Sequence, residues 1–223
     1  MSHATAADLR SARRVLIQGV TGSGKSTAAA RIGRALGLPV HLADEEIGFL
    51  PASEAVWTNR EPDQMRAIAA EITAEPGWVL DASYSSFRDI VLERADIVVG
   101  LDYPRWLSLG RLLRRTAGRL RDRTPVCSGN RETLRQTLGG ESIIVWHFQT
   151  FADKRATMRD WALDPAGGGP PQVGRGRPRE EHGDARDSQE TERREGAWAR
   201  AGPPTMLGDG PGRLDALIAQ ISS

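Results

Sequence analysis

Eight consecutive residues near the N-terminus have the types and spacing of a loop that binds the phosphate groups of a nucleotide. Residues 19–26 (G-V-T-G-S-G-K-S) match the pattern GxxxxGK(S/T) at every specified position. Glycines let the backbone approach an anion closely, and successive backbone N–H groups converge on one hollow where a helix begins. The Lys25 ammonium would reach the β- and γ-phosphates, and the Ser26 hydroxyl would ligate a bridging Mg²⁺. The pattern therefore predicts a site for a nucleoside triphosphate with Mg²⁺.

Lysine usage supports this interpretation over a glycine-rich turn without a ligand. Among 30 basic residues only Lys25 and Lys154 are lysine, so the composition strongly favours arginine. A lysine in a chain that otherwise uses arginine is therefore a candidate for a functional role. We assign nucleotide binding to the loop and the start of its helix, at Gly19, Thr21, Gly22, Ser23, Gly24, Lys25, Ser26 and Thr27.

The predicted strands and helices that would position this loop alternate along the chain. Short apolar runs at residues 15–19, 39–43, 78–81 and 97–101 predict strands, and helical patterns at 25–36, 62–75, 86–95, 106–123 and from 144 onward separate or follow them. Because each run is continuously apolar, the strands favour a parallel sheet covered on both faces. We therefore predict a three-layer α/β/α P-loop fold with four to five parallel strands and ligands at their carboxyl ends.

The hydrophobic pattern changes near residue 164, which predicts four segments. Residues 1–13 are polar and Ala-rich and are expected to be flexible, and residues 14–163 form the folded domain. Residues 164–212 contain 18 glycines and prolines in 49 positions and are expected to be a disordered linker. Residues 213–223 carry apolar side chains at the spacing of a short amphipathic helix.

Composition narrows the function classes. The 30 basic and 29 acidic residues give a net charge of +1, which argues against a chain held on nucleic acid or a membrane by charge alone. No apolar run approaches about 20 residues and the N-terminus lacks a signal-peptide core, so we expect a cytoplasmic protein. The single cysteine, Cys127, has no partner for a disulfide or a zinc site and is expected to be structurally inert.

Three motifs in order give the chain a resemblance to a known family. These are the loop at 19–27, residues 38–42 (L-P-V-H-L) followed by Asp44, and residues 78–84 (W-V-L-D-A-S-Y), which are similar to the family pattern W-I-(I/L)-D-G-N-Y. Residues 95–105 (A-D-I-V-V-G-L-D-Y-P-R) further match A-D-x-x-(I/V)-x-L-D-x-P-R. Over residues 14–163 the chain resembles the adenylate-kinase-like small P-loop kinases, in the branch labelled DNA topology modulation proteins. The resemblance implies an ATP- and Mg²⁺-dependent phosphotransferase.

The chain departs from this family at two places. Ala82 and Ser83 replace the glycine and asparagine that usually follow the third-strand aspartate, which could change how a phosphate or substrate approaches there. The family's fifth strand would fall near residues 171–173, in Gly/Pro-rich sequence. Either the sheet has four good strands, or the reading frame of the C-terminus has changed.

Carboxylates and an arginine after the strands are further candidates for the site. Asp81 lies where the relatives hold a magnesium-bound water, and a carboxylate there suits a hard cation. Asp44 follows the second strand and could accept or orient the hydroxyl proton of an acceptor, or be a solvated residue in an acidic run. Arg88 could hold an anionic group of the acceptor.

An arginine-rich helix follows the fourth strand. Its arginines fall within 19 residues, at Arg105, Arg111, Arg114, Arg115, Arg119, Arg121 and Arg123. By resemblance this is where such kinases carry their lid, whose arginines stabilise the moving phosphoryl group. We favour Arg115 and Arg119 for that role, against the alternative of a solvated basic face. The aromatic residues and His147 at helical spacing are typical of core packing, and we assign them no chemistry.

Two functions remain open on the sequence. The first is a kinase that transfers the γ-phosphoryl group of ATP to a nucleotide or another small molecule. The acceptor motif of true adenylate kinases is not recognisable, so adenylate kinase activity itself is not expected. The second is a nucleotide-dependent regulatory or DNA-associated protein, whose arginine segment would contact phosphate backbone, although no recognition-helix motif is present.

Overall fold

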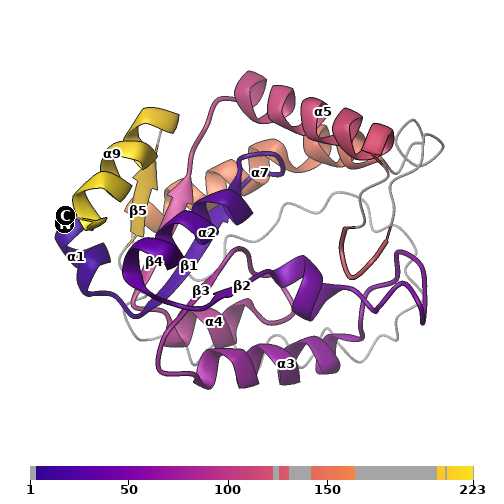
Figure 1. Ribbon diagram of the computed structural model, residues 1–223, viewed down its shortest axis with the longest axis horizontal. Coiled ribbons are helices and arrows are strands. Elements are labelled where there is room, and N and C mark those ends of the chain that lie inside the picture. Colours follow the sequence, from indigo (N-terminus) through magenta and orange to yellow (C-terminus); the bar gives the residue numbers. More distant parts are fainter. Residues whose placement is uncertain (1–3, 123–125, 131–141, 164–204, 209, 223) are drawn as a thin grey trace.

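A five-stranded parallel sheet forms the middle layer of the protein. The computed structural model describes residues 4–122, 126–130, 142–163, 205–208 and 210–222. The strand order is β2-β3-β1-β4-β5, and every neighbouring pair is parallel. The strands are β1 (Arg14–Gly19), β2 (Val40–His41), β3 (Trp78–Leu80), β4 (Ile97–Leu101) and β5 (Thr205–Gly208). The prediction of a parallel α/β fold built around a P-loop is therefore confirmed (Figure 1).

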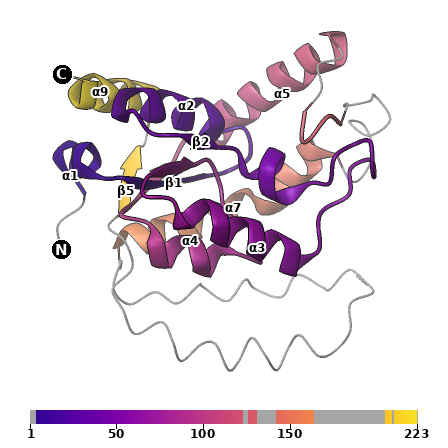
Figure 2. The ribbon, with the colours of Figure 1, turned by 60° about the horizontal axis from the view of Figure 1, so that its bottom comes forward.

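Helices cover both faces of this sheet, as Figure 2 shows. One face carries α1 (Ala6–Ser11), α2 (Lys25–Leu36) and α9 (Pro211–Ser222), and the other carries η1 (Ala43–Gly48), α3 (Pro62–Ala74) and α4 (Arg88–Arg94). Helix α7 (Ile143–Leu163) packs on β1, β5 and α5 (Arg105–Asp122). Since both faces are covered, Val15–Ile17 of β1 and all five residues of β4 are buried.

Local sequence explains where the helices begin and end. Helix α2 begins at Lys25 directly after the loop and ends at Leu36, where the capping residue Gly37 has φ +67° and donates its N–H to the Gly33 carbonyl oxygen. A left-handed residue at this position is usually glycine because it lacks a Cβ. Helix α3 begins with Pro62, as predicted, and Glu61 and Gln64 form a capping box.

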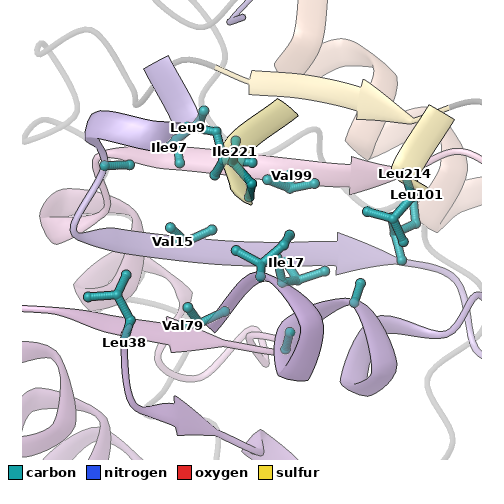
Figure 3. Close-up of a cluster of buried hydrophobic side chains, with 14 of the residues drawn as sticks. Leu9, Val15, Ile17, Leu38, Val79, Ile97, Val99, Leu101, Leu214 and Ile221 are labelled. Atoms are coloured by element: carbon teal, nitrogen blue, oxygen red, sulfur yellow. The ribbon is translucent and has the colours of Figure 1, made fainter. Parts of the chain in front are cut away.

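Residues 1–13 contain a helix where flexible chain was expected. Thr5 and Asp8 form a capping box that starts α1, and the Leu9 side chain is fully buried in the apolar cluster shared with α2 and α9. Figure 3 shows Leu9 beside Ile97 and Ile221. The expectation of a flexible segment was wrong here because the short helix is stabilised by a C-terminal partner that local sequence does not reveal.

The fifth strand lies inside the segment that composition marks as a linker. Residues Thr205–Gly208 pair with β4, with Val98 opposite Thr205, and the Asp102 N–H donates to the Gly208 carbonyl oxygen at 2.9 Å. The linker expectation is therefore wrong for these residues, and so is the alternative of a four-stranded sheet. Residues 171–173, where the strand was expected, lie outside the described residues. Helix α9 follows β5 where the amphipathic helix was expected, with Leu214 and Ile221 buried.

Within the described part of the chain, no helix has the length and apolar character needed to cross a membrane.

Candidate active site

The loop between β1 and α2 has the backbone geometry of an anion cradle. Gly22 and Gly24 adopt φ of +83° and +92°, in the left-handed region that favours glycine. A Cβ on Gly22 would lie 2.4 Å from the backbone oxygen of Ser108 in α5, so the loop passes too close to that helix for any side chain. Helix α2 begins at the end of this loop, and its free N–H groups face the hollow in which phosphate would bind.

The Lys25 side chain folds back onto the backbone of the loop. Its ammonium donates to the carbonyl oxygens of Gly19 at 3.0 Å and Val20 at 3.2 Å. Burial lowers the pKa of Lys25, while the negative charges of Asp44 and Asp81 oppose that shift. The lysine is thus a partly desolvated cation held by weak neutral acceptors, and an anion that entered the loop would be a better partner.

Ser26 and Asp81 meet at the start of α2. The Ser26 hydroxyl donates to Asp81 Oδ2 at 2.6 Å, and the Ala43 N–H donates to Asp81 Oδ1 at 2.8 Å. Burial raises the pKa of Asp81, against the effect of the Ser26 and Ala43 hydrogen bonds and of Lys25. The structure therefore places two potential metal-ligating oxygens, the Ser26 hydroxyl and the Asp81 carboxylate, next to each other beside the loop.

These oxygens fit a magnesium ion of the kind used with nucleotides. Mg²⁺ prefers hard oxygen ligands, keeps several waters and needs only one or two protein ligands when phosphates supply the others. Among the described residues there is no group of three or more His, Cys, Asp or Glu side chains arranged for a metal. A cation at this edge would therefore be held by Ser26 and Asp81 together with phosphate oxygens and water.

Asp44 lies on η1, and Tyr84 fixes its orientation. The Tyr84 hydroxyl donates to Asp44 Oδ1 at 2.6 Å, and its ring stacks on Phe87 with the ring centres 5.5 Å apart. Burial and the Asp44 charge raise the pKa of Tyr84, so the phenol stays protonated and remains a donor. A Cβ on Gly48 would lie 2.4 Å from the Tyr84 oxygen, which shows how tightly η1 packs on this side chain. Tyr84 is not among the site residues predicted from the sequence.

Glu45, next to Asp44, is held by a turn that follows α5 in the chain. Its carboxylate accepts the Cys127 N–H at 2.8 Å and the Ser128 N–H at 2.5 Å, while the Ser128 hydroxyl donates to the Glu45 carbonyl oxygen at 2.5 Å. Cys127, Ser128 and Gly129 all have positive φ, of 45°, 61° and 90°. Burial raises the pKa of the Cys127 thiol to about 12, in keeping with an inert thiol. This turn ties the arginine-rich region to the element that carries Asp44.

The predicted arginines are distributed over two elements. Arg88 begins α4 as a half-buried side chain, and burial lowers its pKa. On α5, Arg111 contacts the loop, donating to the Ser23 carbonyl oxygen at 2.9 Å. Arg115 is exposed and its charge acts on Lys25, while the charge of Arg119 acts on Cys127. The loop is therefore reached by Arg111 and by the charge of Arg115, and the charge of Arg119 acts on the turn at Cys127.

Helix α7 supplies a contact to the loop that sequence reasoning missed. The buried His147 ring lies with Nδ1 3.0 Å from the Thr21 carbonyl oxygen, and Nδ1 must be the donor because a carbonyl only accepts. Burial lowers the pKa of His147, so the ring is neutral at pH 7. Further along the helix, Arg155 and Arg159 both pair with the buried Asp102 after β4. A lone histidine among apolar residues carries no local signal of this contact.

Removing the His147 contact is expected to loosen the loop. His147→Leu should weaken ADP binding by about three- to tenfold and lower the free energy of unfolding by about 1 kcal/mol, because the Thr21 carbonyl loses a buried donor. His147→Asn places an amide N–H near the position of Nδ1 and should retain most of both quantities. Calorimetric titration and urea unfolding measure them. Equal behaviour of the two variants would show that this hydrogen bond does not support the loop.

The fold and this loop define an α/β P-loop protein. The sequence matches no protein-family model and no curated protein. Among solved structures, a gluconokinase from Sinorhizobium meliloti 1021 is 18% identical with a TM-score of 0.45, over 94% of this chain and 89% of the other. A shikimate kinase from Acinetobacter baumannii is 15% identical with a TM-score of 0.47, over 96% and 93%. A deoxyadenosine kinase from M. mycoides is 12% identical with a TM-score of 0.39, over 93% and 97%.

Proposed function

We propose that this protein is a small P-loop kinase that transfers the γ-phosphoryl group of ATP to a small-molecule acceptor in the presence of Mg²⁺. The observation that carries the proposal is the hydrogen bond of 2.6 Å between Ser26 and Asp81, which lies beside the Lys25 loop and within the electrostatic range of Asp44. In this proposal the loop, the Ser26–Asp81 pair and Asp44 would act as phosphate cradle, cation site and base at the carboxyl edge of one sheet. The sequence resemblance to the adenylate-kinase-like group, in the DNA topology modulation branch, supports the same proposal.

In this proposal the loop residues bind and orient the triphosphate. The N–H groups of the loop and of the first turn of α2 donate to the phosphate oxygens, and Lys25 exchanges its carbonyl partners for the β- and γ-phosphates. Ser26 and Asp81 hold the Mg²⁺, directly or through water. When bound, the ion neutralises charge on the phosphate oxygens. Arg111, Arg115 and Arg119 on α5 would add positive charge where the phosphoryl group moves.

The acceptor would bind between Asp44 and Arg88. Its hydroxyl oxygen forms a bond to the γ-phosphorus while the bond from that phosphorus to the bridging oxygen of ADP breaks. The hydroxyl proton goes to Asp44, and since Tyr84 occupies Oδ1, the proton would be taken by Oδ2. Arg88 would hold an anionic group of the acceptor.

Transfer of label from γ-labelled ATP tests the proposal. The purified protein is incubated with Mg²⁺ and a panel of nucleosides, nucleoside monophosphates, sugar acids, sugars and small alcohols. We expect label in one class of acceptor, dependent on Mg²⁺, at a rate that Asp44→Asn lowers by about a hundredfold or more. Label released only to water, or no transfer at all, would contradict a kinase. Binding to duplex DNA that weakens steeply with salt would then favour the regulatory function.

A further inference from the structure

The second lysine of the chain lies on the face of α7 that is turned to the phosphate loop. Lys154 follows His147 by seven residues, about two helical turns, so the two side chains share one face. His147 contacts the loop through its hydrogen bond to Thr21. Phe151, between them on the same face, is buried, which fixes this face toward the protein. Lys154 therefore projects from the surface of α7 that approaches the nucleotide site.

The Lys154 side chain runs back along α7 toward that contact. Its ammonium lies 5.4 Å from the centre of the Trp146 ring, eight residues earlier in the helix. Helical side chains lean toward the N-terminal end of their helix, which allows a lysine to reach this far. Because Trp146 is adjacent to His147, the ammonium lies near the turn of α7 that contacts the loop.

Charges from three other elements act on this ammonium. They are Lys25 at the loop, Asp44 on η1 and Arg88 on α4. Lys154 is exposed to solvent at the rim, but the surrounding protein desolvates it in part, and this burial together with Lys25 lowers its pKa to about 8. The neighbouring cations Arg155 and Arg159 share Asp102, whereas the described contact of Lys154 is with an aromatic ring. The Lys154 ammonium is thus within electrostatic range of the loop lysine, of Asp44 and of Arg88.

We propose that Lys154 is a catalytic residue that contacts the γ-phosphoryl group during transfer, together with Lys25. Like charges close to one another repel unless an anion lies between them, and here the charges of Lys25 and Arg88 act on Lys154, while Asp44 acts on both lysines. The α- and β-phosphates belong to the loop, so the anion that can reach both lysines is the phosphoryl group being transferred. A compact ammonium suits that group, whose charge spreads over its oxygens in the transition state. The inference rests on the proposed kinase function.

Turnover and nucleotide binding of Lys154 variants test this assignment. Lys154→Met should lower kcat by about a hundredfold or more, as expected for a lost donor to transition-state charge. ADP affinity should stay within about twofold of the wild-type value, because ADP lacks the group that Lys154 contacts. Lys154→Arg, which keeps the charge with a different shape, should recover part of the loss. Gln149→Met, two residues from His147 and exposed, is the matched control on the same helix.

A binding ratio gives a second measurement that needs no turnover. The affinity for the imido analogue of ATP, divided by the affinity for ADP, should fall about tenfold in Lys154→Met and stay unchanged in Gln149→Met. An unchanged ratio together with unchanged kcat would overturn the assignment. So would an equal loss of both affinities, which indicates a structural role, or a rise in the acceptor KM alone, which places Lys154 on the acceptor. If the wild-type protein bound neither nucleotide, the proposed function itself would fail.

Discussion

Lys25→Met is expected to lower the affinity for ATP by at least about a hundredfold without destabilising the fold. The variant removes the ammonium that would bind the β- and γ-phosphates, and charge-assisted hydrogen bonds of this kind contribute about 3 kcal/mol or more. In the free protein the same ammonium is partly desolvated and donates to the carbonyl oxygens of Gly19 and Val20. Methionine has a similar length and no charge to desolvate, so the free energy of unfolding should be unchanged or slightly higher.

Nucleotide titration by calorimetry and urea unfolding in the absence of nucleotide measure the two effects. Lys25→Arg is the control for charge alone, because arginine keeps the positive charge but has a bulkier head group. We expect it to bind ATP poorly as well. ATP affinity within a few-fold of wild type in Lys25→Met would remove the loop from the nucleotide site. A large loss of stability would show instead that Lys25 is a structural part of the loop.

Gly22→Ala is expected to cost about 3 kcal/mol of unfolding free energy and to abolish most nucleotide binding. The left-handed backbone at φ +83° penalises any Cβ by about 1–2 kcal/mol. The new methyl would in addition lie 2.4 Å from the Ser108 backbone oxygen and 3.0 Å from the Leu112 Cβ, so the loop and α5 must move apart. Since the loop N–H groups can bind phosphate only in one arrangement, this movement should also weaken binding by about tenfold or more.

Gly37→Ala provides the matched control for this prediction. Gly37 also has a left-handed backbone, with φ +67°, but a Cβ there would have no atom within 4 Å. Its replacement should cost about 1 kcal/mol and leave nucleotide affinity unchanged. The difference between the two variants then measures the contact of the loop with α5. Equal costs would mean that α5 does not constrain the loop.

The phosphate loop and its flanking elements could be predicted because their signals are local. The glycine pattern, the apolar run of β1 and the Gly37 stop signal lie within one stretch, and α2 has the predicted bounds, Lys25–Leu36. The continuously apolar runs likewise predicted buried parallel strands. The positions of Asp44 and Asp81 at one edge follow from the same argument, because parallel strands end together.

The remaining features depend on contacts between distant parts of the chain. Strand β5 is short and flanked by glycines and prolines, and only pairing with β4 makes it a strand. The contacts of His147 and Tyr84 depend on how α7 and η1 pack, which no local pattern encodes. For Lys154 the sequence held one usable signal, the rarity of lysine, but not the element from which the side chain reaches the site.

The late position of β5 in the chain has a consequence for folding. About one hundred residues separate β4 from Thr205, so the sheet gains its last strand through a long-range closure that is costly in chain entropy. During synthesis on the ribosome, β4 therefore remains an unpaired edge, and the apolar face that Leu214 and Ile221 later cover stays open to solvent. In that interval the nascent chain exposes an aggregation-prone surface that chaperones can bind, and the docking of β5 and α9 removes this hazard.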